Sequence, residues 1–109
     1  MGLQKYPLVT VGAAIFNTQD EVLLVKTHKW HHKYGLPGGK VELGEPAEQA
    51  LIREIKEETN LHITDIQFVL HQEVIYSDEF YKPAHFIFLN YRCQTSRSEE
   101  RRVGKECNR

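Results

Sequence analysis

Alternation between apolar runs and polar turns predicts several β-strands around one helix. The run LVTVGAAIF (Leu8–Phe16) is typical of a buried strand, and VLLVKTH (Val22–His28) predicts a second one. The polar stretch NTQDE between them predicts a short turn, so that the two strands would form a hairpin. Two more strands are expected near Ile66–Ile75 and Ala84–Cys93, separated by a polar loop at Ser77–Pro83.

Glycines and helical spacing replace the apolar runs in the middle of the chain. The stretch His28–Lys40 is expected to be a loop, because three glycines and Pro37 interrupt it. A helix is then expected to open with Pro46 at its first position and to run to about Thr59. Asn60 can take the left-handed conformation that ends a helix. Strands on both sides of one helix predict a mixed sheet in an α+β or α/β layer fold.

The composition favours one soluble intracellular domain. The chain has 109 residues, 14 Lys and Arg, 15 Asp and Glu, a net charge of −1 and 40% hydrophobic residues. This balance gives no support to binding of a nucleic-acid polymer through a broad basic field, and the apolar runs are too short to span a membrane. Two cysteines make no disulfide framework, and the first residues show no apolar signal region. We therefore expect a cytoplasmic protein.

The composition changes after Thr95. The last 14 residues, SRSEERRVGKECNR, hold five basic and three acidic residues and no apolar stripe, which is typical of a disordered charged tail or a frayed helix. The stretch Arg97–Cys107 also resembles the translation of a widely used DNA-sequencing adapter over eleven consecutive residues. On that interpretation residues 96–109 are a non-native tail, residues 1–95 are the domain, and the C-terminal part of the natural protein is missing.

The predicted helix carries carboxylates where packing alone would place apolar side chains. Ala47, Leu51 and Ile55 form an apolar stripe at i, i+4 spacing. At ~100° per residue, Glu58 falls about 20° and Glu54 about 60° from Leu51. Glu54 and Glu58 are also a like-charge i, i+4 pair, which costs a few tenths of a kcal/mol unless a positive group lies between them.

Two kinds of positive group could neutralise these carboxylates. Arg53 stands i, i+4 to Glu57 and Lys56 is nearby, so the helix could simply present a solvated charged face. A hard divalent cation such as Mg²⁺ is the alternative, since it prefers carboxylate and carbonyl oxygens. The position of the carboxylates at the core edge, beside a glycine-rich stretch, favours the metal, but these residues alone leave both interpretations open.

The segment GKVELGEPAEQALIREIKEETNL (Gly39–Leu61) resembles the signature of the Nudix hydrolases, G-x5-E-x7-R-E-U-x-E-E-x-G-U, with U an aliphatic residue. The matching positions are Gly39, Glu45, Arg53, Glu54, Ile55, Glu57, Glu58 and Leu61. Asn60 replaces the last glycine of the signature, and Asn tolerates the left-handed conformation better than most residues. The resemblance implies an α+β fold, the Nudix-type α/β/α sandwich with a mixed sheet, truncated at its C-terminus because its final strand and closing helix have no match.

This resemblance also implies a chemistry. Nudix hydrolases cleave nucleoside diphosphates linked to a further moiety, using a divalent metal and a water that attacks phosphorus. By position, Glu57 and Glu58 would be metal ligands together with the backbone carbonyl of Gly39, and Glu54 would be a ligand or the general base. Arg53 would hold the Glu54 carboxylate by a charge-assisted bond. The catalytic candidates are thus Arg53, Glu54 and Glu57, and the expected cofactor is Mg²⁺, with Mn²⁺ as a further candidate.

Candidates outside this segment have simpler alternatives. Lys26, Lys29 and Gly38 could contact the phosphates of a small nucleotide substrate, although a solvated loop is the simpler interpretation of the lysines. Aromatic residues such as Phe80 and Tyr81 could stack on a base, but loop aromatics more often cap the edge of a core.

Three readings of the function follow from the resemblance. The first is an active pyrophosphohydrolase. A homodimer is a further expectation from the resemblance, because Nudix proteins commonly form one. The second is a Nudix-fold binding module without turnover, against which every acidic position of the signature is intact. The third is an inactive, truncated fragment.

Overall fold

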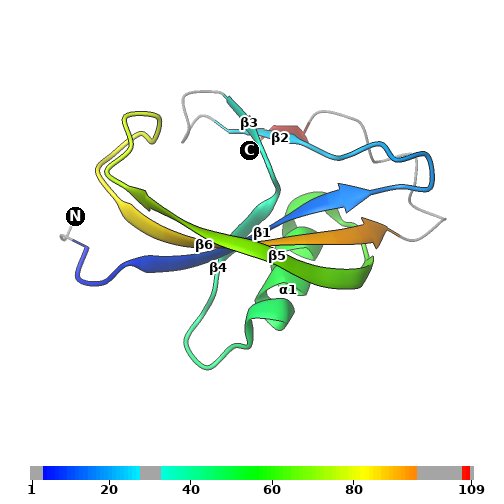
Figure 1. The fold of residues 1–109 in the computed structure, drawn as a ribbon, viewed down its shortest axis with the longest axis horizontal. Helices are drawn as coiled ribbons and strands as arrows, with labels where there is room; N and C mark the ends of the chain where they lie inside the picture. Colours follow the sequence, from blue (N-terminus) through cyan, green and yellow to red (C-terminus); the bar gives the residue numbers. More distant parts are fainter. Residues whose placement is uncertain (1–3, 28–32, 96–106, 109) are drawn as a thin grey trace.

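The computed structural model describes residues 4–27, 33–95 and 107–108 of the chain. Its elements are β1 (Leu8–Phe16), β2 (Val25–Thr27), β3 (Lys33–Gly35), β4 (Gly38–Lys40), α1 (Ala47–Thr59), β5 (Ile63–Ile75), β6 (His85–Thr95) and β7 (Cys107–Asn108). Helix α1 lies on one side of the main sheet, and β2 and β3 stand above the other side (Figure 1).

The main sheet is mixed, as the order of strands and helix predicted. Its four strands lie in the order β4-β1-β6-β5, and a smaller sheet has the order β3-β2-β7. β1 runs parallel to β6, with Leu8 opposite Phe86 and Phe16 opposite Gln94. β4 is antiparallel to β1, and β5 is antiparallel to β6. The expected α+β class is confirmed, with α1 as the helix among the described residues.

The hydrophobic core lies between α1 and the sheet face that this helix covers. The helix contributes Ala50, Leu51 and Ile55, and the sheet contributes Val11, Ala13, Ile15, Tyr91 and Cys93, all of them buried. Burial of each large aliphatic side chain contributes about 1.5–3 kcal/mol to stability. The predicted stripe is therefore the packing face of α1, although Ala47 at its start is only partly buried. None of the helices in the described part of the chain is long and apolar enough to cross a membrane.

The ends of α1 follow the predicted signals closely. Pro46 is the N-cap, with φ −63° and ψ 147°, so it precedes the first helical residue instead of occupying that position. Asn60 is left-handed, with φ 61°, and its N–H donates to the carbonyl of Lys56 at 2.9 Å. Asparagine thus ends the helix as a glycine would.

The predicted turn is present, but the hairpin expected from it was wrong beyond its first pair. Val22 makes only an isolated bridge to Phe16 of β1, and β2 pairs with β3 and β7 in the smaller sheet. The side-chain oxygen of Asn17 accepts the backbone N–H groups of Gln19 and Glu21, both at 2.9 Å, and so fixes the turn.

The expectation of a loop over His28–Lys40 was wrong for its second half. Residues 33–35 and 38–40 form β3 and β4, and β4 adds an edge strand to the main sheet. A strand forms because Gly38 has no side chain: a Cβ there would overlap the carbonyl oxygen of Val11. Residues 28–32 lie outside the described part of the chain.

Of the expected tail, only residues 107 and 108 are described, where β7 pairs in parallel with β2. The interpretation of residues 96–109 as non-native therefore stays a prediction.

Candidate active site

Helix α1 presents its carboxylates at the edge of its buried face. Glu54 and Glu58 are half-buried, whereas Glu57 lies farther out in solvent. The side chain of Glu54 is 16% exposed and that of Glu57 is 60% exposed. The prediction that Glu54 and Glu58 follow the apolar stripe is therefore confirmed, and the helix differs from one built for packing alone.

A two-point ion pair joins the turn before the helix to its middle. Arg53 Nε donates to Glu45 Oε2 at 2.8 Å, and Arg53 Nη2 donates to Glu45 Oε1 at 2.9 Å. The Arg53 hydrogen bonds, together with the backbone N–H of Glu42, lower the pKa of the Glu45 carboxyl. The same contact with Glu45 raises the pKa of Arg53, which stays charged at every working pH.

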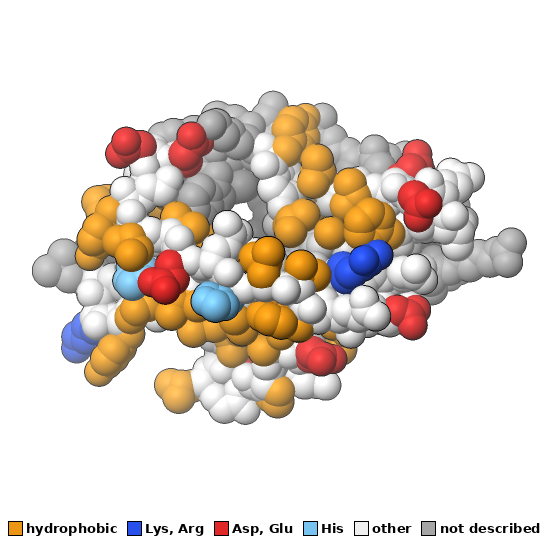
Figure 2. All heavy atoms as spheres, in the orientation of Figure 1, with side chains coloured by type: hydrophobic (Ala, Val, Ile, Leu, Met, Phe, Trp, Pro, Cys, Tyr) orange, Lys and Arg blue, Asp and Glu red, His pale blue; other side chains and the backbone are white. Residues whose placement is uncertain are grey.

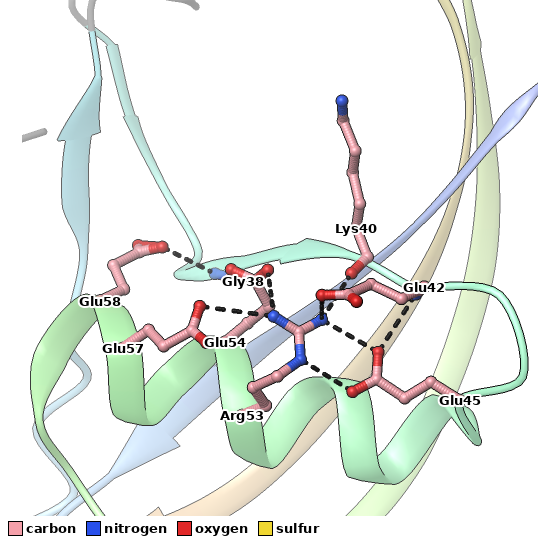
Figure 3. A network of polar contacts seen from close by, with 8 residues as sticks. All are labelled: Gly38, Lys40, Glu42, Glu45, Arg53, Glu54, Glu57 and Glu58. Atoms are coloured by element: carbon pink, nitrogen blue, oxygen red, sulfur yellow. Dashed lines mark hydrogen bonds and ion pairs between the residues drawn. The ribbon is translucent and has the colours of Figure 1, made fainter.

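The remaining donors of Arg53 reach the acidic residues and β4 (Figure 3). Its Nη1 donates to Glu54 Oε2 at 3.0 Å and to Glu57 Oε1 at 3.4 Å. Its Nη2 also donates to the backbone carbonyl of Lys40 at 3.1 Å. One guanidinium thus ties two helix carboxylates and the sheet edge together, as its planar fork of donors permits.

The residues Gly38 and Gly39 let α1 and β1 come close to β4. At Gly39 a Cβ would overlap the carboxylate of Glu54, so that this carboxylate lies directly against the backbone. At the neighbouring Gly38, the backbone N–H donates to Glu58 Oε2 at 3.4 Å. Both glycines therefore position carboxylates of the helix against the backbone of β4.

These residues share one pocket, with a volume of about 1120 Å³. Gly38, Gly39, Glu54 and Glu58 line one part of it, and aromatic side chains of β6 and of the preceding loop line another. A space-filling view shows an opening above the main sheet, with hydrophobic side chains gathered along that sheet (Figure 2). The acidic residues and the aromatic residues thus face a common space.

The three predicted carboxylate ligands do not converge on one point. Arg53 holds Glu54 and Glu57, while Glu58 turns toward the backbone of Gly38 (Figure 3). Accordingly, within residues 4–27, 33–95 and 107–108, no group of three His, Cys, Asp or Glu side chains is placed to hold a metal ion. The metal ligands remain a prediction from the resemblance.

The predicted substrate contacts are only partly within the described structure. Gly38 lines the pocket. Lys26 lies on β2, where the described backbone says nothing of its side chain, and Lys29 falls outside the described residues.

A cation that the sequence interpretation missed is Lys40. It lines the pocket beside Glu54, and its side chain points away from the Arg53 network (Figure 3). Its position directly after the two glycines was the signal that could have found it. Where glycines let a strand approach a helix closely, the side chain that follows them lies near the same site.

The fold and the site together define a class of protein. A short glycine-containing strand leads into a helix whose Glu54 and Glu58 line a pocket on a mixed sheet, with Arg53 holding Glu54 in place. The NUDIX domain family model matches residues 6–108, and the chain belongs to this family.

Known relatives and solved structures agree with this assignment. An ADP-ribose pyrophosphatase from Methanocaldococcus jannaschii is 44% identical over 61 residues, which cover 54% of this chain and 36% of that protein. An RNA pyrophosphohydrolase from Blochmanniella pennsylvanica is 34% identical over 61 residues, covering 56% of this chain and 39% of that protein. The crystal structure of a MutT NUDIX hydrolase from Burkholderia pseudomallei superposes with a TM-score of 0.72 at 30% identity, covering 84% of this chain and 70% of the other. The chain thus matches less than two fifths of the length of either curated relative.

Proposed function

We propose that this protein is a divalent-metal-dependent pyrophosphohydrolase, which cleaves a nucleoside diphosphate linked to another moiety by attack of water at phosphorus. One observation carries the proposal: Arg53 holds the Glu54 carboxylate against Gly39 at the edge of the pocket. Two relatives, an RNA pyrophosphohydrolase and an ADP-ribose pyrophosphatase, support the same class of reaction.

The chemistry of the available donors fits a hard divalent cation. Carboxylates on α1 and backbone carbonyls of β4 offer oxygen ligands only, and Mg²⁺ and Mn²⁺ favour such ligands over nitrogen or sulfur. The close approach at Gly39 brings the Glu54 carboxylate directly against the β4 backbone. Glu57, Glu58 and the Gly39 carbonyl would hold the cation, with Glu54 as a further ligand. When bound, such a cation would neutralise phosphate charge and lower the pKa of a bound water.

The protein's own residues supply the remaining tasks. Arg53 fixes the position of Glu54, and Glu45 in turn fixes the guanidinium of Arg53 through two hydrogen bonds. Where it is not a ligand, Glu54 accepts the proton of the attacking water as a general base. The exposed ammonium of Lys40 contacts the phosphates, because it lines the same pocket and carries the opposite charge.

The substrate class and the setting are part of the proposal. We infer a small nucleotide substrate, a cytoplasmic protein without a membrane partner, and a homodimer as the assembly to test. One relative is named as an RNA pyrophosphohydrolase. A binding assay with RNA would therefore test our expectation that this protein binds no nucleic-acid polymer. A binding module without turnover is the competing function, and an inactive fragment is the competing state of this chain.

Substitution of the predicted ligands tests the activity. Glu57→Gln or Glu58→Gln is expected to lower Mg²⁺-dependent hydrolysis of ADP-ribose and nucleoside triphosphates at least about a hundredfold, because a neutral amide is a poor ligand for a hard cation. Glu48→Gln is the matched control, since Glu48 lies in the first turn of the same helix, exposed to solvent. Wild-type rates in both ligand variants would remove the metal assignment. Absence of hydrolysis by the wild-type chain, with nucleotide binding retained, would favour the binding module.

A further inference from the structure

The pocket continues from the acidic helix onto the open face of the main sheet, where polar side chains interrupt an aromatic surface. We propose that Thr10, Gln72 and Asn90 on this sheet face form a subsite that reads the hydrogen-bonding edge of a purine base. The inference rests on the proposed function, because it names the part of a nucleotide that lies beyond the phosphates.

The register of the strands places these three residues on one face. Thr10 of β1 and Gln72 of β5 both stand opposite Phe88 of β6. In the next row, Asn90 stands opposite Gly12. Residues directly opposite on neighbouring strands share a face of the sheet, and all five line the pocket.

The polar groups of this face have bonding capacity to spare. The Thr10 hydroxyl oxygen is buried and has no hydrogen-bond partner among the described residues. Asn90 Nδ2 donates to Gln72 Oε1 at 3.0 Å. This bond leaves the Asn90 carbonyl oxygen and amide N–H groups of both side chains for a ligand. A buried hydroxyl without a partner, such as that of Thr10, is costly, so a ligand that pairs it is favoured over one that does not, while the more exposed Asn90 and Gln72 amides offer further hydrogen bonds.

Gly12 keeps the approach to Asn90 open. A Cβ at Gly12 would lie 3.7 Å from Asn90 Oδ1 and 3.6 Å from the carbonyl oxygen of Pro37. Without that carbon, a flat group can lie on the β1 backbone and present its edge to the amide. An amide offers a donor and an acceptor side by side, which matches the paired groups along the edge of adenine or guanine.

Aromatic side chains surround these polar groups. Phe80 packs against Phe86 with ring centroids 4.9 Å apart, and Phe86 packs against Phe88 at 5.4 Å. All three line the pocket together with Tyr81. Such a surface favours a flat, two-ring heterocycle, since contact with aromatic rings grows with the stacked area. An aliphatic ligand would leave the Thr10 hydroxyl without a hydrogen bond.

Binding of nucleoside monophosphates in the absence of divalent metal tests the subsite directly. We expect the full chain to bind AMP and GMP at least about tenfold more tightly than ribose 5-phosphate, and more tightly than UMP, in calorimetric titrations with EDTA. Equal affinity for AMP and ribose 5-phosphate would overturn the proposal. Equal affinity for AMP and UMP would overturn its assignment to purines.

Three subsite variants and one control variant separate recognition from folding. Asn90→Leu and Gln72→Leu are expected to weaken purine binding about tenfold and to leave ribose 5-phosphate unaffected, whereas Gln67→Leu on the exposed part of β5 should change neither. Thr10→Val removes a hydroxyl that makes no hydrogen bond within the described part of the chain, so it should keep the fold and still weaken purine binding several-fold. Unchanged purine affinity in Thr10→Val and Asn90→Leu, with the fold intact by circular dichroism, would contradict the subsite.

A substitution at the predicted metal site distinguishes this proposal from the hydrolase assignment. Glu58→Gln is expected to lose hydrolysis and to keep purine monophosphate binding. Purine binding without hydrolysis in the wild type would leave the base subsite standing and remove the enzymatic assignment. Hydrolysis without any preference for a base would do the opposite.

Discussion

The carboxylate of Glu54 occupies the space that a side chain at Gly39 would need. Helix α1 and strand β4 therefore meet where the carboxylate of Glu54 lies against the backbone of Gly39. Both residues belong to the proposed metal site, so we expect the glycine to matter for the chemistry as well as for the packing.

Exchange of Gly39 for alanine should damage activity more than stability. The new methyl group would displace the Glu54 carboxylate, which can turn aside because it ends a flexible side chain. We expect hydrolysis to fall at least about tenfold while the fold is kept, since small displacements of catalytic groups are expensive. Measurement of kcat/KM beside thermal unfolding would show this. Gly35→Ala is the control, because a Cβ at Gly35 would have no neighbour within 4 Å among the described residues. Wild-type activity in Gly39→Ala would disprove the prediction.

The neighbouring substitution, Gly38→Ala, should have the opposite balance. Its methyl group would overlap backbone atoms of Val11 and Gly12, which cannot move without opening the pairing of β1 and β4. The free energy of unfolding is expected to fall by about 1–3 kcal/mol, as for other overpacked sites. Urea unfolding of the two glycine variants side by side would test the contrast, and equal stabilities would contradict it.

Arg53→Lys should not behave as a conservative change. Lysine keeps the charge but cannot donate to Glu45 at two points and also reach Glu54. We expect kcat to fall more than about tenfold, because Glu54 would lose the contact that fixes it. The reverse exchange on the same helix, Lys56→Arg, serves as the control. Similar kcat values for Arg53→Lys and the wild type would show that the network has no role in catalysis.

The Arg53–Glu45 pair should contribute stability only above acid pH. The pKa of Glu45 is lowered in the folded protein from an ordinary value of 4.5, so this contribution is fully present above pH 4.5. As the pH falls from there through the lower folded pKa, the unfolded chain takes up a proton first, and the contribution is lost. Urea unfolding of the wild type and Glu45→Gln between pH 3 and 7 should show a difference that shrinks with acidification. A difference that does not depend on pH would contradict this account.

Cys93 should resist thiol reagents while the protein is folded. Burial raises its pKa to about 12 from an ordinary value of 9.0, so very little thiolate exists at pH 8.5. In a Cys107→Ser background, iodoacetamide should modify Cys93 in urea and leave it intact in buffer, as read by mass spectrometry. Rapid modification of the folded chain would show that the sheet opens at β6.

The local sequence pattern predicted those elements whose own residues determine whether they form a helix or a strand. β1 was found with its exact bounds because it is a continuous apolar run, and α1 was found because its stripe and its Asn60 terminus are local signals. β4 was missed because its three residues are polar or glycine, and only the approach of β1 makes them a strand.

The candidate site shows the same division. The spacing of Glu54 and Glu58 along the helix placed both at the core edge, where the structure has them. The polar side chains on the sheet face of the pocket could not be predicted. Thr10, Gln72 and Asn90 are far apart in the sequence, and only the register of the strands places them on one face. Lys40 follows the two glycines directly in the sequence, but only the structure shows that it lines the pocket.

The parallel pairing of β1 with β6 has a consequence for biosynthesis. Strand β1 leaves the ribosome well before its partner β6, so the sheet that supports the site cannot close until residues 85–95 have emerged. Until then, the apolar side chains of β1 cannot be fully buried, among them Val11, Ala13 and Ile15. The nascent chain therefore exposes an apolar strand to solvent and to chaperones. A ribosomal pause before β6 has emerged would prolong that exposure, whereas a pause after its emergence would find the four-stranded sheet already able to form.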